Sequence, residues 1–240
     1  MGESKRYLRF DIHQRIQHVM MFVSFIGCTI SGLPIRYYDT GWAAAITKLF
    51  GGFDRMFAFH LIMASLMLLC CVYHLGYLVM LAIRKKWSWA TIPAPKDFKD
   101  VYDMLRYFFG RTDALPKFER YSYKEKFDYW AVFWGIFIIG GSGLMMWFPE
   151  ISAQYFPRWV IQSARVAHSD EAILAIIVIF AWHFYNVHFN PSFFPGNKVW
   201  FMGYLTREEL EREHPLELER IERTGIETSK PVNKKTKSKK

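Results

Sequence analysis

The chain contains four long apolar stretches without any Asp, Glu, Lys or Arg, at residues 16–35, 56–83, 129–149 and 172–197. A helix that rises about 1.5 Å per residue needs about 20 residues to cross the ~30 Å hydrocarbon core of a bilayer. The pattern therefore predicts an all-α fold, an integral membrane four-helix bundle. We expect the four-span domain to cover residues 1–205, with a charged cytoplasmic tail over residues 206–240.

One connection between these stretches has a helical pattern of its own. In DFKDVYDMLRYFFG, the apolar residues Phe98, Val101, Leu105 and Phe108 follow one another at three- and four-residue steps. This spacing predicts an amphipathic helix lying at the membrane surface. A docking surface for a partner subunit would have the same pattern, so the sequence leaves both interpretations open.

Basic residues are distributed unevenly among the connections. The N-terminal flank, the segment between the second and third stretches and the C-terminal tail are rich in Lys and Arg, whereas the other two connections contain few. Because short basic loops stay on the cytoplasmic side of a membrane, we expect both termini to be cytoplasmic. The N-terminal flank is too charged for an ordinary cleaved signal, so we expect the first span to be retained.

Charge and cysteine content narrow the function. Of the net charge of +9, six lysines lie within residues 230–240, so the rest of the chain carries only +3. A lysine-rich end beside membrane spans is typical of a segment that faces lipid headgroups, and we expect no nucleic-acid binding. The three cysteines lie in apolar stretches and no C-x-x-C-H motif occurs, which excludes covalently attached c-type haem.

Histidines are the candidate functional residues, because ionisable side chains within a membrane are costly and usually functional. On ideal helices, His60 and His74 would differ by about 40° and His168 and His183 by about 60°, with about 21–22 Å between the members of each pair. This spacing suits two haems b stacked across a bilayer, with imidazole nitrogens as axial ligands. A zinc site would need three or four ligands at one depth. Six histidines lie in or at the edge of the apolar stretches: His18, His60, His74, His168, His183 and His188.

Two of the histidine pairs are five residues apart, so their members point in different directions on a helix. His188 is five residues from His183, a rotation of about 140°, so the two cannot face the same haem from one helix. His13 and His18 are also five apart, and only His18 lies inside the apolar stretch. His18 is therefore the candidate ligand of that pair.

Motifs spread over nearly the whole chain carry a family resemblance. The sequence resembles the cytochrome b subunit of respiratory formate dehydrogenases, and more distantly the cytochromes b of nickel-iron hydrogenases. The resemblance rests on the order and spacing of RIQHVMMF with the following ISGLP, Arg55 to His60, ERYSYKEKFDYWAVFW, GSGLMMW, AQYFP, WHFYNV and GYLTREELEREHPLELERI.

The resemblance implies a membrane cytochrome with two haems b, multi-pass in a bacterial or archaeal cytoplasmic membrane. It implies that His18 and His183 ligate the inner haem, and that His60 and His168 ligate the outer one. Such a subunit relays electrons between quinone, a diffusible substrate, and a partner redox subunit at the outer face. We expect an iron-sulfur or multihaem cytochrome subunit as that partner.

Two departures from the family pattern keep other ligand schemes open. His74 matches no expected ligand, and the spacing from His168 to His183 is one residue longer than usual. In a bc-type scheme, two histidines on each of two helices hold both haems, His74 pairs with His183, and His18 is spare. In a third scheme, His74 with His188 or His13 helps to hold an additional haem.

The quinone site of the resembled family draws on the loop that leads into the third span, by the inner haem, where an Asn-x-Gly-Gln-Lys pattern is usual. This chain has Ser122 at the first position and Glu125 at the fourth. Both are candidates for the quinone vicinity, and Glu125 is also a candidate proton relay. A solvated loop charge with no such role is the competing interpretation.

Two further expectations concern three glycines of the third stretch and an alternative class of function. Gly140, Gly141 and Gly143 are expected to allow close helix packing. The alternative to a cytochrome is a haem-free membrane anchor or transporter subunit.

Overall fold

The computed structural model describes residues 6–191 and 194–225, and the lysine-rich stretch at 230–240 lies outside these residues. The chain is divided into two compact units. The membrane unit comprises residues 16–87 and 130–196. The terminal unit comprises residues 1–15, 88–129 and 197–240, and so contains both ends of the chain.

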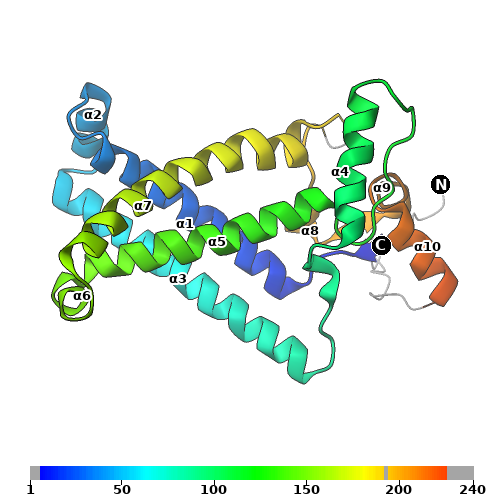
Figure 1. Cartoon of the computed structure of the whole chain (residues 1–240), viewed down its shortest axis with the longest axis horizontal. Helices are drawn as coiled ribbons and strands as arrows, with labels where there is room; N and C mark the ends of the chain where they lie inside the picture. Colours follow the sequence, from blue (N-terminus) through cyan, green and yellow to red (C-terminus); the bar gives the residue numbers. More distant parts are fainter. Residues whose placement is uncertain (1–5, 192–193, 226–240) are drawn as a thin grey trace, which may run out of the picture. The chain divides into compact units, whose positions relative to one another are not determined.

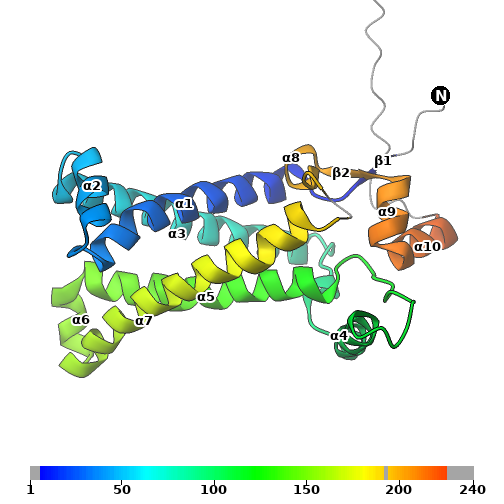
Figure 2. The same ribbon diagram turned by 90° about the horizontal axis from the view of Figure 1, so that it is seen from above.

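Four long helices run side by side (Figures 1 and 2). Each is long and apolar enough to cross a membrane, which confirms the predicted all-α four-span bundle. They are α1 (Ile12–Arg36), α3 (Phe53–Ile83), α5 (Tyr123–Trp147) and α7 (Arg158–Ile177), the last continued by the π-helical segments η2 (Val178–His183) and η3 (Tyr185–Phe189).

The fourth helix differs from its predicted span at both ends. It begins at Arg158 rather than at 172, because charged residues lie inside the helix and do not end it. One of them, Asp170, is paired with Arg36 of α1, at 2.8 Å between Oδ1 and Nη2. The helix ends at Phe189, just before Pro191, because proline has no N–H to continue the helical hydrogen bonds.

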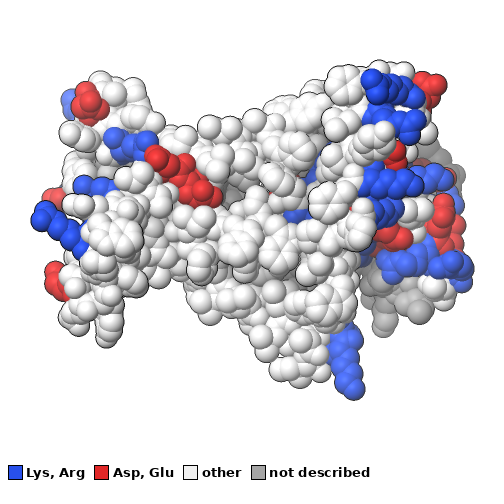
Figure 3. Space-filling view, in the orientation of Figure 1, with Lys and Arg blue, Asp and Glu red and all other residues white. Residues whose placement is uncertain are grey.

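Small residues form much of the buried side of α1. On α1 the buried positions include Ser24, Gly27 and Ser31, at three- and four-residue steps. A Cβ at Gly27 would lie 2.4 Å from Cγ of Met63 on α3, so only glycine permits this approach. Close contact through small residues is the usual packing of helices in lipid. The face of the bundle seen in Figure 3 is largely uncharged and appears white.

Short helices occupy the two connections on one side of the bundle, α2 (Gly41–Leu49) between α1 and α3, and α6 (Pro149–Tyr155) between α5 and α7. Figure 1 shows both at the same end of the four long helices.

The terminal unit joins the two ends of the chain. Strand β1 (Arg6–Leu8) pairs antiparallel with β2 (Tyr204–Thr206), with Tyr7 opposite Leu205. Around this ribbon lie α8 (Val199–Met202), α9 (Arg207–Glu213) and α10 (Pro215–Thr224). The predicted domain boundary between 205 and 206 falls inside β2. A small core holds the unit together, formed by Tyr7, Leu205, Leu210, Leu218 and Ile221.

The segment between the second and third spans belongs to the same unit. It contains the short 3-10 helix η1 (Trp89–Thr91) and the helix α4 (Pro95–Phe108). The helix predicted from the apolar spacing in this segment is therefore present.

Candidate functional site

The membrane unit contains two pairs of histidines, and within each pair the two rings lie opposite each other. The ring centres of His18 on α1 and His183 on η2 are 6.5 Å apart. The ring centres of His60 on α3 and His168 on α7 are 6.4 Å apart. Each pair joins two different helices, so the four imidazoles form two separate sites rather than one cluster.

These separations fit an iron atom between the two rings of each pair. A metal lies about 2 Å from a ligating imidazole nitrogen, and that nitrogen lies about 1.1 Å from its ring centre, so an iron midway between two imidazoles holds their centres about 6.3 Å apart. The part of the chain described contains no group of three or more His, Cys, Asp or Glu placed to hold a metal ion. Two-histidine axial ligation of haem fits this arrangement, whereas a zinc site does not.

Hydrogen bonds fix the tautomers of His60 and His168. Nδ1 of His168 lies 2.9 Å from the carbonyl oxygen of Ile139, which only accepts, so Nδ1–H is the donor. Nδ1 of His60 lies 3.0 Å from Oγ of Ser31, whose own hydroxyl donates to Gly27 O at 2.7 Å. Both rings therefore carry their proton on Nδ1, which leaves the Nε2 lone pair for a metal.

The same tripeptide supports both of these rings. Ser31-Gly32-Leu33 on α1 faces His60, and Ser142-Gly143-Leu144 on α5 faces His168. A Cβ at Gly32 would lie 3.2 Å from Cε1 of His60, and one at Gly143 would lie 3.1 Å from Cε1 of His168. Each glycine therefore leaves the space that the imidazole occupies.

We predict that Gly143→Ala will displace the His168 ring and lower the haem content of the site that it shares with His60. The new methyl group would be closer to Cε1 than ordinary van der Waals contact allows. Gly141→Ala is the matched control, because a Cβ there meets nothing within 4 Å on the same helix. Haem extraction and low-temperature optical spectra of both variants provide the measurement. Equal spectra and equal haem contents would contradict this role of Gly143.

The helix carrying His168 and His183 changes from α to π geometry between them, at Val178. In a π-helix each N–H bonds five residues back, so about 4.4 residues complete a turn. This lowers the angular offset of His183 from His168 from about 60°, expected for an unbroken α-helix, to about 30°. The spacing from His168 to His183 is one residue longer than in the resembled family, and the π segment accommodates this residue. Both histidines therefore stay on one side of the helix.

The remaining membrane histidines have other contacts. Nδ1 of His74 on α3 lies 2.8 Å from Oε1 of Gln17, the buried residue next to His18. His188 packs edge-on against Phe184, with ring centres 5.6 Å apart. A Cβ at Gly196 would lie 2.9 Å from Nδ1 of His188, so the backbone approaches this ring closely. His13 lies in the first turn of α1, in the terminal unit.

Ser122 and Glu125 form the N-terminal cap of α5. The backbone N–H and hydroxyl of Ser122 donate to Oε2 of Glu125, at 2.7 and 3.0 Å, and the Glu125 N–H lies 3.5 Å from Ser122 Oγ. This is the reciprocal capping box that Ser-x-x-Glu favours at a helix start. Glu125 is therefore not a simple solvated loop charge.

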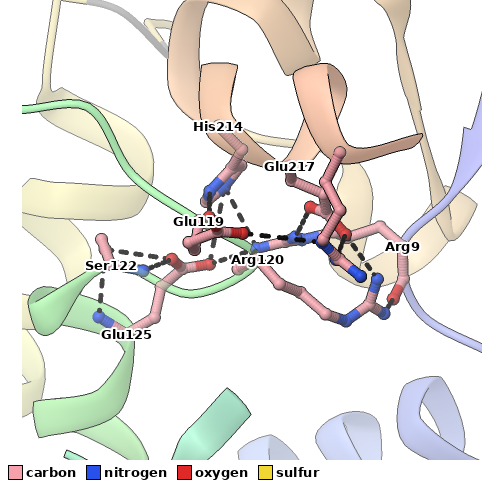
Figure 4. A network of polar contacts seen from close by, with 8 residues as sticks. Arg9, Glu119, Arg120, Ser122, Glu125, His214 and Glu217 are labelled. Carbon is pink, nitrogen blue, oxygen red and sulfur yellow. Dashed lines mark hydrogen bonds and ion pairs between the residues drawn. The ribbon is translucent and has the colours of Figure 1, made fainter. Parts of the chain in front are cut away.

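A network of buried charges surrounds this cap (Figure 4). The Arg9 guanidinium donates to Glu217 at 2.6 Å, to Glu125 at 3.0 Å and to the carbonyl of Arg120. Arg120 donates in turn to Glu217 Oε1 at 2.8 Å. The side chains of Arg9 and Glu217 are only 3% and 2% exposed. The network therefore ties the N-terminal segment, the start of α5 and helix α10 to one another.

His214 completes the network as a neutral acceptor. Its Nδ1–H donates to the Glu119 carbonyl at 2.7 Å, and its Nε2 lies 3.1 Å from Nη2 of Arg9. Burial and the neighbouring Arg9 charge hold the pKa of His214 below its ordinary value, although Glu125 and Glu217 oppose this shift. His214 is therefore uncharged at neutral pH and accepts from Arg9.

Neither the contacts that support the histidines nor the buried charge network was predicted from the sequence. The tripeptide Ser-Gly-Leu occurs in both span one and span three, and this repeat was a signal for the contacts that support the histidines. A glycine beside a hydroxyl allows a polar ring to approach closely. Arg9 and Glu217 gave no such signal, because they are 208 residues apart in sequence.

Comparison with known proteins agrees with this architecture. Residues 9–202 match the family described as prokaryotic cytochrome b561. The cytochrome b556 subunit of the nitrate-inducible formate dehydrogenase of Escherichia coli is 20% identical over 225 residues, which are 93% of this chain and 95% of the relative. The corresponding subunit from Shigella flexneri gives the same values.

The family match covers all four spans and both histidine pairs. The family match and the cytochrome b relative identify a b-type cytochrome that takes part in electron transfer. It crosses the bacterial inner membrane several times. The chain belongs to the prokaryotic cytochrome b561 family.

Proposed function

We propose that this protein is a dihaem electron-transfer subunit, relaying electrons between the quinone pool and a partner redox subunit. The observation that carries the proposal is the presence of two histidine pairs, each joining two helices at the separation of a bis-imidazole haem. Haem b, when bound, supplies the one-electron chemistry.

The protein's own residues hold and orient the cofactors. His18 and His183 are the proposed axial ligands of one haem, and His60 and His168 of the other. Ser31 and the Ile139 carbonyl accept from Nδ1 of His60 and His168, which directs Nε2 of each ring toward the metal position. The surrounding apolar helices exclude water from both sites.

The contacts of His74 and His188 favour two haems over three. His74 is bonded to Gln17, so we propose that it holds the rotation of α1 that presents His18 to the bundle. His188 packs on Phe184 and beside Gly196, and we propose a packing role for it. The bc-type scheme is disfavoured because His18, which it leaves spare, lies opposite His183.

The partner and topology are proposed from the relatives and the charge pattern. The Escherichia coli relative is a subunit of a formate dehydrogenase, which favours an iron-sulfur subunit of an oxidoreductase complex as partner here. A multihaem cytochrome is the second candidate. The basic connections favour a topology with both termini in the cytoplasm and the partner at the opposite face.

The quinone site is proposed at the start of α5, at Ser122 and Glu125, with Glu125 exchanging the quinol proton. We expect Glu125→Gln to slow haem reduction by a quinol analogue about 100-fold. Glutamine keeps the capping box, so the helix start is retained. Stopped-flow haem reduction in proteoliposomes is the measurement.

The matched control is Glu119→Gln in the same loop, a surface glutamate whose partner is Arg220 at 3.7 Å. It removes one carboxylate without touching the α5 cap. If Glu125→Gln and Glu119→Gln both reduce haem at the unmodified rate, Glu125 is a helix cap only and the quinone proposal for this segment fails.

A further inference from the structure

Helix α4 has its charged side buried and its apolar side exposed. Asp97 and Asp100 are 9% and 5% exposed, whereas Phe98 on the other side is 75% exposed. Tyr102 and Leu105 are also exposed. In a unit surrounded by water the helix would be expected to bury the opposite side. This orientation therefore requires something apolar outside the helix.

The buried aspartates are neutralised within the terminal unit. Lys126 Nζ lies 3.0 and 2.8 Å from the two carboxylate oxygens of Asp97. Lys96 Nζ lies 2.7 Å from Oδ1 of Asp100 and donates to the Lys117 carbonyl at the same distance. These bonds fix the rotation of α4, so its apolar side cannot turn inward without breaking them.

The same bonds join α4 to the start of α5. Lys126 belongs to the first turns of α5, which continues as one of the four candidate spans. A helix bonded at Asp97 to the start of a span lies where that span enters the bilayer. The apolar side of α4 is therefore presented at the depth of the headgroups and upper acyl chains.

The charge that remains on the outer side of α4 is mainly positive. At about 100° per residue, Phe98, Tyr102 and Leu105 share an arc of about 60°, and Lys99 and Arg106 border it on one flank. Asp103 is the nearest acidic residue, 3.8 Å from Arg106. Figure 3 shows Lys and Arg gathered over α4 and the segment after it. Aromatic residues flanked by cations suit an anionic lipid surface.

We propose that α4 is an in-plane anchor that binds anionic phospholipid, with its aromatic side at the acyl boundary and Lys99 and Arg106 on the phosphate groups. The anchor holds the start of α5 at a constant depth through the Lys126–Asp97 bond. This role is independent of haem number and of the quinone proposal.

Spin labels at Leu105→Cys and Asp103→Cys test the proposal, in a chain whose three native cysteines are replaced by alanine. The purified chain is placed in nanodiscs of phosphatidylcholine with or without phosphatidylglycerol. We expect the ratio of oxygen to nickel-chelate accessibility to be about tenfold higher at 105 than at 103 in the anionic discs. The double variant Lys99→Gln with Arg106→Gln should lose the difference between the two lipid mixtures.

Two outcomes would overturn the proposal. If the nickel chelate reaches position 105 as readily as position 103 in both mixtures, α4 does not enter the bilayer surface. If position 105 is protected only when copurified subunits are present, a protein partner covers this face instead.

A second measurement does not depend on the cysteine-free chain. Native mass spectrometry counts the phosphatidylglycerol molecules retained by the full chain and by the double variant of Lys99 and Arg106. We expect at least a twofold loss in the double variant, because each cation adds to the attraction of an anionic surface. Equal retention contradicts the proposal.

Discussion

Under the proposed dihaem ligation, replacing His183 with alanine will lower the haem b content from two to one per chain. His183 lies opposite His18 at a bis-imidazole separation, and the other pair is formed by different side chains. Without His183, that site would hold its haem by one imidazole only and would lose it during purification, whereas His60 and His168 would still hold the other haem. Haem extraction against protein concentration, with a redox titration of the retained signal, is the measurement.

Substituting the other histidines separates the ligand schemes. His18→Ala should remove the same haem as His183→Ala, and His60→Ala or His168→Ala should remove the other. His74→Ala should keep both haems, although the loss of its bond to Gln17 should alter the spectrum of the haem that His18 holds. Loss of a haem in His74→Ala together with full retention in His18→Ala would replace the proposed pairing with the bc-type scheme.

Arg9→Ala will strongly destabilise the terminal unit. The side chain is 3% exposed and bonds Glu217, which is 2% exposed, as well as Glu125. Removing it leaves buried carboxylates without their main cation, which costs about 3–5 kcal/mol. We expect the amides of α10 to exchange with solvent at least about 100-fold faster, as measured by hydrogen–deuterium exchange with mass spectrometry.

Arg207→Ala is the matched control for Arg9. Arg207 also bonds two glutamates, Glu211 at 2.9 Å and Glu222 at 3.0 Å, but all three side chains are largely exposed. Water screens such surface pairs, so α10 should keep its protection. If Arg9→Ala behaves like Arg207→Ala, the buried network does not hold the terminal unit together.

The spans and the histidines could be predicted from sequence because their signals are local. Uncharged runs marked the four helices, and the histidines within or beside these runs were the candidate ligands. The fourth helix begins before the uncharged run from which its span was predicted, because a count of charged residues does not register that Arg36 pairs with Asp170 from another helix. A charge paired across helices does not end a span.

Other features depend on geometry that a single sequence does not carry. The phase of His183 could not be obtained from a constant 100° per residue, since the helix changes to π geometry at Val178. The capping role of Glu125 and its bond to Arg9 needed the N-terminal segment to return to the start of α5. Contacts of this range become visible only in three dimensions.

Haem stoichiometry tests the central claim most directly. The purified wild-type chain, reduced with dithionite, should show b-type bands, contain two haems b per chain and give a low-spin bis-imidazole signature in near-infrared magnetic circular dichroism. A chain purified in folded form without b-type bands would contradict the haem assignment. A ratio of one haem per chain would contradict the pairing of His18 with His183 and of His60 with His168, and a ratio of three would contradict the proposed dihaem count.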